Sequence, residues 1–176
     1  MNITAGKYKG QKITAPDENI TRPTLSKVRM SVFNTLQCMV DFDGSSFLDM
    51  YGGSGIMGLE ALSRGFSTVV AIEKNKKVYS VTKSNFKKYE KDSDLKLILG
   101  DSLKTCAKLG KKFDVIYIDP PYFSGINEKS LEVAKNIANG VVIIEHAVDV
   151  DFAGYEIIKQ KKYGDKFITF LKVDDV

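Results

Sequence analysis

An acidic residue, two prolines and an aromatic ring follow one another from Asp119 to Tyr122, directly after the apolar run at residues 113–118. This run is rich in β-branched residues and predicts a buried strand. Proline has no N–H for the hydrogen-bond ladder of a sheet, so the strand must end before Pro120. The acid and the ring therefore lie just past the carboxyl end of a strand, which is where open α/β sheets bind ligands.

This loop suits reactions at an amino group on a purine ring. Such an amino group is a weak nucleophile because its lone pair is delocalised into the ring. A carboxylate and a backbone carbonyl that accept its two hydrogens can localise the lone pair toward an electrophile, and the ring of Tyr122 can stack on the base for roughly 1–3 kcal/mol. With an expected pKa of about 4, Asp119 should orient and stabilise charge rather than take a full proton. The competing interpretation is a proline-stiffened turn without chemistry.

The length and composition favour one globular domain over residues 1–176. The chain is 43% hydrophobic and 27% charged, which is ordinary for a globular protein, and its length supports one core better than two. A membrane helix needs about eighteen consecutive apolar residues, and no run in this chain approaches that length. The N-terminus lacks an apolar signal core. We therefore expect a cytoplasmic protein with no membrane partner. Cys38 and Cys106 are isolated and His146 is the one histidine, so we expect reduced cysteines and no metal site.

Residues 1–40 predict an extension made of a short hairpin and a helix. Residues 1–15 alternate weakly in polarity and predict the hairpin. Thr24 can cap the helix, whose apolar stripe runs from Leu25 to Met39 in steps of three and four residues. The basic residues of the hairpin and of the polar helix face either lie in solvent or contact the phosphates of a polyanion, with which the formal net charge of +4 is compatible. These residues are Lys7, Lys9, Lys12, Lys27 and Arg29.

Strands and helices alternate through residues 41–176, the predicted core. Five apolar runs predict strands, at residues 46–51, 68–73, 95–101, 113–118 and 141–146. Helices are predicted between them, at residues 59–65, 76–89, after Ser102 and at 128–138. Two last strands flank the hairpin signal Gly164-Asp165. This order predicts an α/β, Rossmann-like fold with a mostly parallel seven-stranded sheet and helices on both faces.

A glycine-rich turn follows the first predicted strand. Gly53-x-Gly55-x-x-Gly58 matches the dinucleotide-binding fingerprint. Glu73 lies about twenty residues further on, at a spacing that lets a carboxylate take a ribose diol. An NAD-dependent oxidoreductase is therefore one interpretation, although the chain lacks room for a separate substrate domain.

S-adenosylmethionine fits the same turn better, because it carries an adenosine and an amino-acid end but no phosphate. Acids stand at or near the ends of the first four predicted strands and would gather at one edge of the sheet. Glu73 is placed for the ribose, Asp101 for the adenine, and Asp49 with the glycine backbone for the amino-acid end. The predicted cofactor-binding residues are Asp49, Tyr51, Gly53, Gly55, Glu73, Asp101 and Ser102.

Six parts of the chain, in this order, resemble the RsmD-like class I methyltransferases, which methylate N2 of a guanine in bacterial small-subunit ribosomal RNA. They are RPTLSKVRMSVFNTL (22–36), FLDMYGGSGIMGLEALSRG (47–65), Glu73, GDSL (100–103), FDVIYIDPPY (113–122) and KKYGDKFI (161–168). Two positions depart from the family pattern. Met30 stands where the family favours an acid, and Gly53 stands where it favours alanine or a similar residue.

The resemblance implies roles for the loop after the fourth strand. Asp119 and the Pro120 carbonyl would bind the guanine 2-amino group, Tyr122 would stack on the base, and S-adenosylmethionine would give the methyl group without a metal. Arg22, Lys27, Arg29 and the hairpin lysines would contact RNA phosphates. The partner would be 16S ribosomal RNA, in the small subunit or its assembly intermediate. We expect a monomer, because nothing in the sequence demands a dimer. A base in structured RNA must be splayed out to reach such a pocket.

Three alternatives stay open at this point. The same loop serves N6-methylation of adenine in DNA or another RNA in families that share it. An NAD-dependent oxidoreductase belongs to a different class and would differ in the cofactor it binds. The third is a non-catalytic RNA-binding module that keeps the fold, which loss of methylation in Asp119→Ala with RNA binding retained would exclude.

Overall fold

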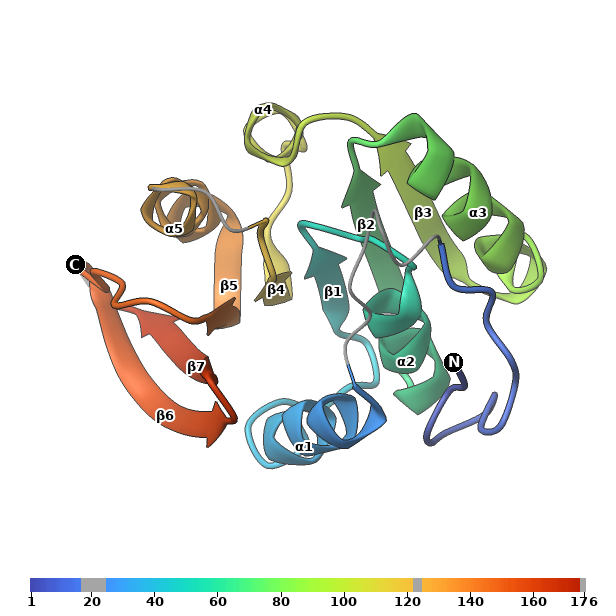
Figure 1. The fold of residues 1–176 in the computed structure, drawn as a ribbon, viewed down its shortest axis with the longest axis horizontal. Coiled ribbons are helices and arrows are strands. Elements are labelled where there is room, and N and C mark those ends of the chain that lie inside the picture. Colours follow the sequence, from blue (N-terminus) through green and yellow to red (C-terminus); the bar gives the residue numbers. More distant parts are fainter. Residues whose placement is uncertain (17–24, 122–124, 175–176) are drawn as a thin grey trace.

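Seven strands form one sheet in the order β3-β2-β1-β4-β5-β7-β6 (Figure 1). The structure is a computed structural model that describes residues 1–16, 25–121 and 125–174. The strands are β1 Ser46–Asp49, β2 Thr68–Glu73, β3 Asp94–Leu99, β4 Phe113–Ile118, β5 Ala138–His146, β6 Tyr155–Tyr163 and β7 Lys166–Val173.

The sheet is mostly parallel, as the sequence predicts. The strands β1 to β5 pair with their neighbours in parallel, whereas β7 lies antiparallel to both β5 and β6. The order runs outward from β1 to β3 on one side and from β4 to β5 on the other, so its direction reverses between β1 and β4. Ligands of open α/β sheets bind at this switch point, outside the carboxyl ends of the strands.

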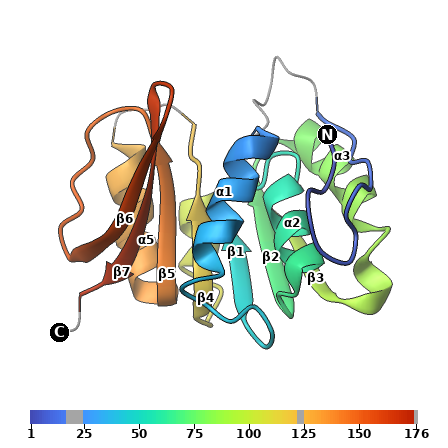
Figure 2. The same ribbon diagram turned by 90° about the horizontal axis from the view of Figure 1, so that it is seen from below.

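Helices cover both faces of the sheet (Figure 2). The helices α1 Ser26–Leu36, α2 Ile56–Arg64 and α3 Lys76–Phe86 pack on one face, and α4 Ser102–Cys106 and α5 Ile126–Ile137 on the other, with a 3₁₀ turn at Glu90–Asp92. Alternation along β2 shows why both faces are apolar: Val69 and Ala71 join one core cluster, and Val70 and Ile72 join the other. None of the helices among the described residues is long and apolar enough to cross a bilayer.

Local sequence explains where the helices near the site begin and end. The helix α2 starts at Ile56, three residues before the predicted helix, directly after the glycine turn, and stops at Gly65, whose φ of +114° suits glycine. The helix α3 is capped by Asn75, whose side chain accepts hydrogen bonds from the backbone N–H groups of Lys77 and Val78. The predicted first strand is shorter than expected and ends at Asp49.

The N-terminal segment, residues 1–16, which we call the arm, folds back on itself as the predicted hairpin does. An antiparallel bridge joins Asn2 and Lys12, and backbone hydrogen bonds run from Ile3 N–H to the Gln11 carbonyl at 3.1 Å and from Ile13 N–H to the Met1 carbonyl at 2.8 Å. The arm also bonds to α2: Thr4 N–H donates to Glu60 at 2.9 Å and Lys7 N–H to the Ser63 carbonyl at 2.7 Å. The predicted cap Thr24 lies outside the described residues.

Candidate active site

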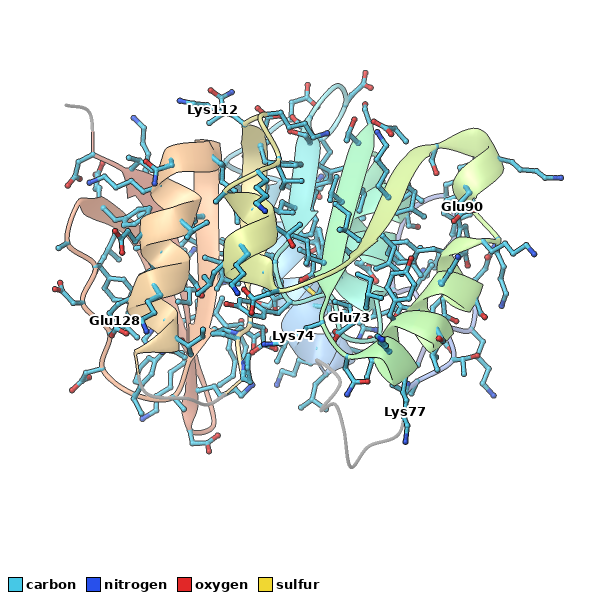
Figure 3. The ribbon with its side chains drawn as sticks, turned by 90° about the horizontal axis from the view of Figure 1, so that it is seen from above. Glu73, Lys74, Lys77, Glu90, Lys112 and Glu128 are labelled. Atoms are coloured by element: carbon cyan, nitrogen blue, oxygen red, sulfur yellow. The ribbon has the colours of Figure 1, made fainter. Side chains whose placement is uncertain are left out.

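Five acidic side chains stand along the carboxyl edge of the sheet. Asp49 ends β1, Glu73 ends β2, Asp101 follows β3 and Asp119 follows β4, as the sequence predicts. Glu145, on β5, is the fifth and was not among the predicted site residues. In Figure 3, Glu73 and Lys74 mark the carboxyl edge at one end of the molecule, and Lys112, which precedes β4, lies at the opposite end.

Asp119 lies beside the β6–β7 hairpin. Its side chain is 25% exposed, and its Oδ1 is 3.9 Å from Lys166 Nζ at the start of β7. Burial and the nearby Glu145 raise the pKa of the Asp119 carboxyl to about 7, against the opposing charge of Lys166. The expected pKa of about 4 is therefore wrong, because it assumed a solvated carboxyl. A pKa near 7 is suited to a general base at neutral pH.

Glu145 and Lys166 form a charged pair next to Asp119. Lys166 Nζ lies 3.4 Å from Glu145 Oε2, and the hydroxyl of the buried Tyr117 donates to Glu145 Oε1. Burial, together with Glu145 and Asp119, raises the pKa of Tyr117 well above its usual value, so Tyr117 remains a donor. The signal that could have revealed Glu145 is an acid inside the otherwise apolar run VVIIEH.

Asp49 is a buried acid with 1% of its surface exposed. It accepts a hydrogen bond from the backbone N–H of Tyr51 at 3.2 Å. Burial first, and then Asp119, Glu73 and Glu145, raise its pKa to about 8, although the Tyr51 bond opposes the shift. Among the described residues, Asp49 has no lysine or arginine within salt-bridge distance. A cationic ligand group at this place would favour its charged form.

The glycine turn fixes Glu73. Glu73 Oε2 accepts the Gly53 N–H at 2.9 Å and its Oε1 accepts the Asn75 N–H at 2.6 Å. Two donors hold the carboxylate in one orientation and leave further lone pairs for a ligand hydroxyl. Position 55 requires a glycine for structural reasons as well. The φ of Gly55 is +79°, and a Cβ there would stand 2.5 Å from the Phe86 ring.

Asp101, Ser102 and Tyr51 also lie near this edge, with their side chains already engaged. Asp101 caps α4 through the Lys104 N–H at 3.2 Å and pairs with Lys74 at 3.1 Å, and these contacts lower its pKa. The Ser102 hydroxyl donates to the Met50 carbonyl. The Tyr51 hydroxyl bonds to Ser130 Oγ at 2.7 Å. The side chains of Ser102 and Tyr51 thus hold the edge together, and a role in binding stays a prediction.

One predicted phosphate contact is wrong. Lys7, Lys9 and Lys27 are exposed, as expected, but Arg29 is 1% exposed. Its guanidinium donates to the Asn2 carbonyl at 2.7 Å and its Nε lies 3.8 Å from Glu60 Oε2. The buried face of α1 includes residues 29, 32, 33 and 36. The predicted apolar stripe contained Val28, so at the start of the helix the buried face is shifted by one residue from the prediction.

Two predicted site residues, Arg22 and Tyr122, lie outside the described residues, and Pro120 is buried next to Asp119. The described residues contain no group of three or more His, Cys, Asp or Glu side chains that could hold a metal ion.

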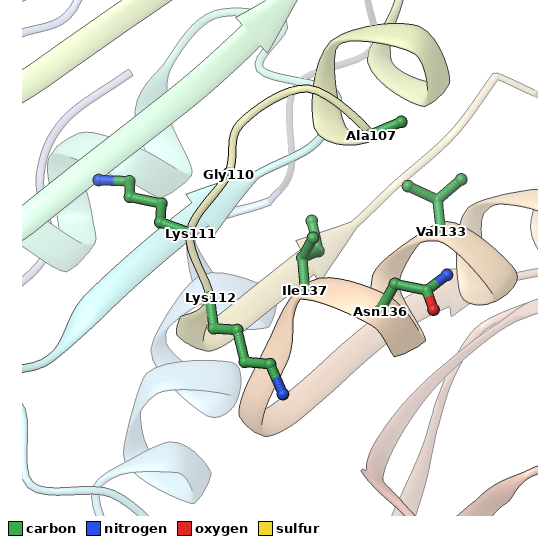
Figure 4. A pocket seen from close by; sticks show the side chains of 7 residues that line it. All are labelled: Ala107, Gly110, Lys111, Lys112, Val133, Asn136 and Ile137. Atoms are coloured by element: carbon green, nitrogen blue, oxygen red, sulfur yellow. The ribbon is translucent and has the colours of Figure 1, made fainter.

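A hollow of about 560 Å³ lies at the opposite edge of the sheet (Figure 4). Ala107 and Lys111, in the connection from α4 to β4, and Val133 and Ile137, on α5, line it. Because Lys111 and Lys112 directly precede β4, the hollow is separated from Asp119 by the length of that strand. It contains no acid and does not belong to the candidate site.

Known proteins resemble this chain along most of its length. Residues 1–172 match the family described as "Conserved hypothetical protein 95". "Ribosomal RNA small subunit methyltransferase D" of Buchnera aphidicola subsp. Acyrthosiphon pisum is 34% identical over 137 residues, which cover 76% of this chain and 69% of that protein. The protein of the same name from Escherichia coli K12 is 29% identical over 152 residues, covering 86% and 74%.

The fold is also found among solved structures. The protein yhhF from Escherichia coli superimposes with a TM-score of 0.87 at 24% identity, over 99% of this chain and 98% of that one. At this identity, the likeness shows the fold alone.

Proposed function

The chain belongs to the conserved hypothetical protein 95 family, which is the RsmD family, and from this premise we propose that it transfers a methyl group from S-adenosylmethionine to the exocyclic N2 amino group of a guanine in 16S ribosomal RNA. The substrate class is supported by the relatives that are named small-subunit ribosomal RNA methyltransferases. Such a role belongs in the cytoplasm, where ribosomes assemble. The oxidoreductase alternative has no support from the family.

The observation that carries the proposal is the setting of Asp119. Its carboxyl stands at the switch point of the sheet, one-quarter exposed, and is followed by the buried Pro120. A purine amino group that donates one hydrogen to this carboxylate and the other to the Pro120 carbonyl would point its lone pair away from both acceptors. Methylation turns that nitrogen cationic until it loses a proton, and a carboxylate with a pKa of about 7 can accept it.

The residues at the glycine turn fit S-adenosylmethionine. When bound, this cofactor supplies a methyl group activated by a sulfonium. Asp49 is buried without a cationic partner among the described residues, so it can pair with the ammonium of the amino-acid end. Glu73 is held by two backbone N–H donors with lone pairs left over for the ribose diol. Asp101, ionised by its contacts with Lys104 and Lys74, can accept from the adenine amino group.

Lys166 and Glu145 support Asp119 rather than touch the substrate. The Lys166 ammonium lies between two carboxyls, 3.9 Å from Asp119 and 3.4 Å from Glu145. Its charge keeps a fraction of Asp119 ionised at neutral pH, although burial and Glu145 favour the protonated form. We infer that this pair sets the pH range in which Asp119 can accept the amino hydrogens.

The test is transfer of labelled methyl groups to small ribosomal subunits that lack their own modification, followed by digestion and identification of the nucleoside. N2-methylguanosine that disappears in Asp119→Ala supports the proposal. N6-methyladenosine would keep the site and replace the base. Binding of S-adenosylmethionine without transfer to particles or naked ribosomal RNA would refute the ribosomal assignment.

A further inference from the structure

Positive charge is concentrated in two segments of the chain, the arm at residues 1–16 and residues 76–88, which span α3. Together they contain eight lysines and no acidic residue, whereas the whole chain has a formal net charge of +4. All other residues together therefore have a net charge of −4. A folded protein that places its excess charge on two segments has a directional field, and such fields recruit partners of opposite charge.

The two segments pack against each other. Asn85, buried on α3, donates to the Thr14 carbonyl at 2.9 Å and accepts the Thr14 N–H at 3.1 Å. Tyr89 donates to Gln11 at 2.6 Å, and its ring meets the Tyr8 ring at 4.8 Å. Figure 1 shows the arm, in dark blue, passing the C-terminal end of α3. The lysines of both segments therefore belong to one surface.

The side chains of α3 divide cleanly between core and solvent. Val78, Thr82, Asn85 and Phe86 are buried, and the lysines are exposed. Lys76, Lys83 and Lys87 follow one another in steps of seven and four residues, so they share one line along the helix, about 16 Å long. Like charges in adjacent turns repel by a few tenths of a kcal/mol, which a bound polyanion would relieve.

The arm holds its lysines in fixed positions. Ile3 and Ile13 are buried in the core cluster of α1 and α2, and Tyr8 N–H donates to Ser63 Oγ at 2.9 Å. The backbone around Lys7 and Lys9 is thus ordered before any partner arrives, which reduces the entropy lost on binding.

We propose that the lysine surface, defined as the eight exposed lysines of the two segments, binds the phosphate backbone of the RNA outside the active site. These residues are Lys7, Lys9, Lys12, Lys76, Lys77, Lys83, Lys87 and Lys88. This assignment rests on the proposed function. The geometry leads from the surface to the acids: α3 begins next to Glu73 at the carboxyl edge, where Lys74 and Lys77 lie, and runs toward Glu90 at the other end (Figure 3). A strand of RNA along α3 would deliver a neighbouring nucleotide to Asp119.

The experiment compares two triple variants with the same change in charge. K83Q/K87Q/K88Q removes three charges from the lysine surface. K108Q/K111Q/K112Q removes three exposed charges between α4 and β4, at the opposite edge. Affinity for a ribosomal RNA fragment is measured against salt concentration, and KM and kcat are measured on small subunits. The first variant should lose about 2 from the slope of log affinity against log salt, at about 0.7 per phosphate contact of a single strand.

The same variant should raise KM for the RNA on the order of 10-fold and leave kcat and S-adenosylmethionine binding unchanged. K83R/K87R/K88R should restore the parent values, because arginine keeps the charge. The control variant should behave like the parent.

The proposal is overturned if K83Q/K87Q/K88Q keeps the parent slope and KM, or if both triple variants lose affinity equally. It is also overturned if this variant keeps its RNA affinity and instead loses binding to vesicles of phosphatidylglycerol. A parent protein that binds RNA with a steep salt dependence but transfers no methyl group would refute the proposed function. The binding slope would still test the surface in that case.

Discussion

Two sets of acids differ in how their carboxyl groups are paired: Glu60, between the arm and α2, and the pair Asp49 and Asp119, at the carboxyl edge of the sheet. Glu60 on α2 is fully buried, and its oxygens accept from Thr4 N–H at 2.9 Å, Ala5 N–H at 3.2 Å and Arg64 Nε at 3.0 Å. Arg29 adds its charge from α1 at 3.8 Å. This acid joins the arm, α1 and α2, and its oxygens are saturated by the protein itself.

Asp49 and Asp119 have far fewer donors. Asp49 accepts one backbone N–H, at 3.2 Å, and Asp119 has a lysine at 3.9 Å. Burial raises the pKa of both, to about 8 and about 7. A buried carboxyl that lacks donors destabilises the fold once it is charged. The difference teaches where to look for function: the saturated acid holds elements together, and the undersaturated acids are available to a ligand.

The strongest test of this difference between the acids is Asp119→Asn. The amide presents N–H donors where the substrate amino group needs acceptors, so methyl transfer should fall by about 10³-fold. The folded-state pKa of Asp119 is raised, so the stability it contributes is present below pH about 4 and is lost as the pH rises through about 7. The variant should therefore be at least as stable as the parent at pH 8, by thermal unfolding.

Asp114→Asn is the matched control, because Asp114 lies on the same strand at its other end, where it accepts from Ser46 at 2.8 Å. It should keep its methyl transfer per folded molecule. Equal losses of activity in both variants would mean that Asp119 acts through the fold rather than on the substrate.

Glu60→Gln should have the opposite signature. Removing the charge leaves Arg29 and Arg64 buried without their acid, which costs roughly 3–5 kcal/mol of unfolding free energy and lowers the melting temperature by roughly 10 °C. Methyl transfer per folded molecule should stay within about twofold below the transition, since Glu60 touches no substrate. Glu132→Gln, on the exposed face of α5, should change neither. Unchanged melting with lost activity would reverse the roles assigned to the two sets.

Lys166→Met tests whether the pair with Glu145 tunes Asp119. Lys166 lowers the pKa of Asp119, so its removal should raise that pKa above about 7. Because the carboxylate form is required, activity falls as the pH drops through the pKa, and the midpoint of the acid limb should move to higher pH. At pH 7 we expect roughly a 10-fold loss, recovered near pH 9.

Lys166→Arg should restore the parent profile, and Lys162→Met, on the same hairpin, should leave the profile in place. A loss in Lys166→Met that is equal at every pH would show a role in packing instead of titration.

Much of the fold follows from local sequence. Four of the apolar runs form strands that are buried on both faces, namely β1, β2, β4 and β5. The glycines after β1 form the turn, in which Gly53 and Gly55 have positive φ. Acids at strand ends predict the edge where the site lies. Glu145 and Lys166 could not be placed in this way, since their proximity to Asp119 depends on the antiparallel pairing of β5 with β7, in which Glu145 faces Ile168. Arg29 was misplaced because its partner Glu60 comes from another helix.

The smallest predicted effect is the number of protons released when the cofactor binds, and it tests the role of Asp49. Burial and neighbouring acids hold its pKa near 8, so Asp49 is mostly protonated at pH 7 before a ligand binds. If it pairs with the ammonium of S-adenosylmethionine, it must ionise, and binding at pH 7 should release about one proton. Titration calorimetry in buffers of different ionisation enthalpy measures this release, which should vanish in Asp49→Asn and persist in Glu73→Gln. A binding enthalpy that is the same in every buffer would show that Asp49 does not contact the charged end of the ligand. Of the two undersaturated acids, Asp119 would then act on the substrate and Asp49 would only pack in the fold.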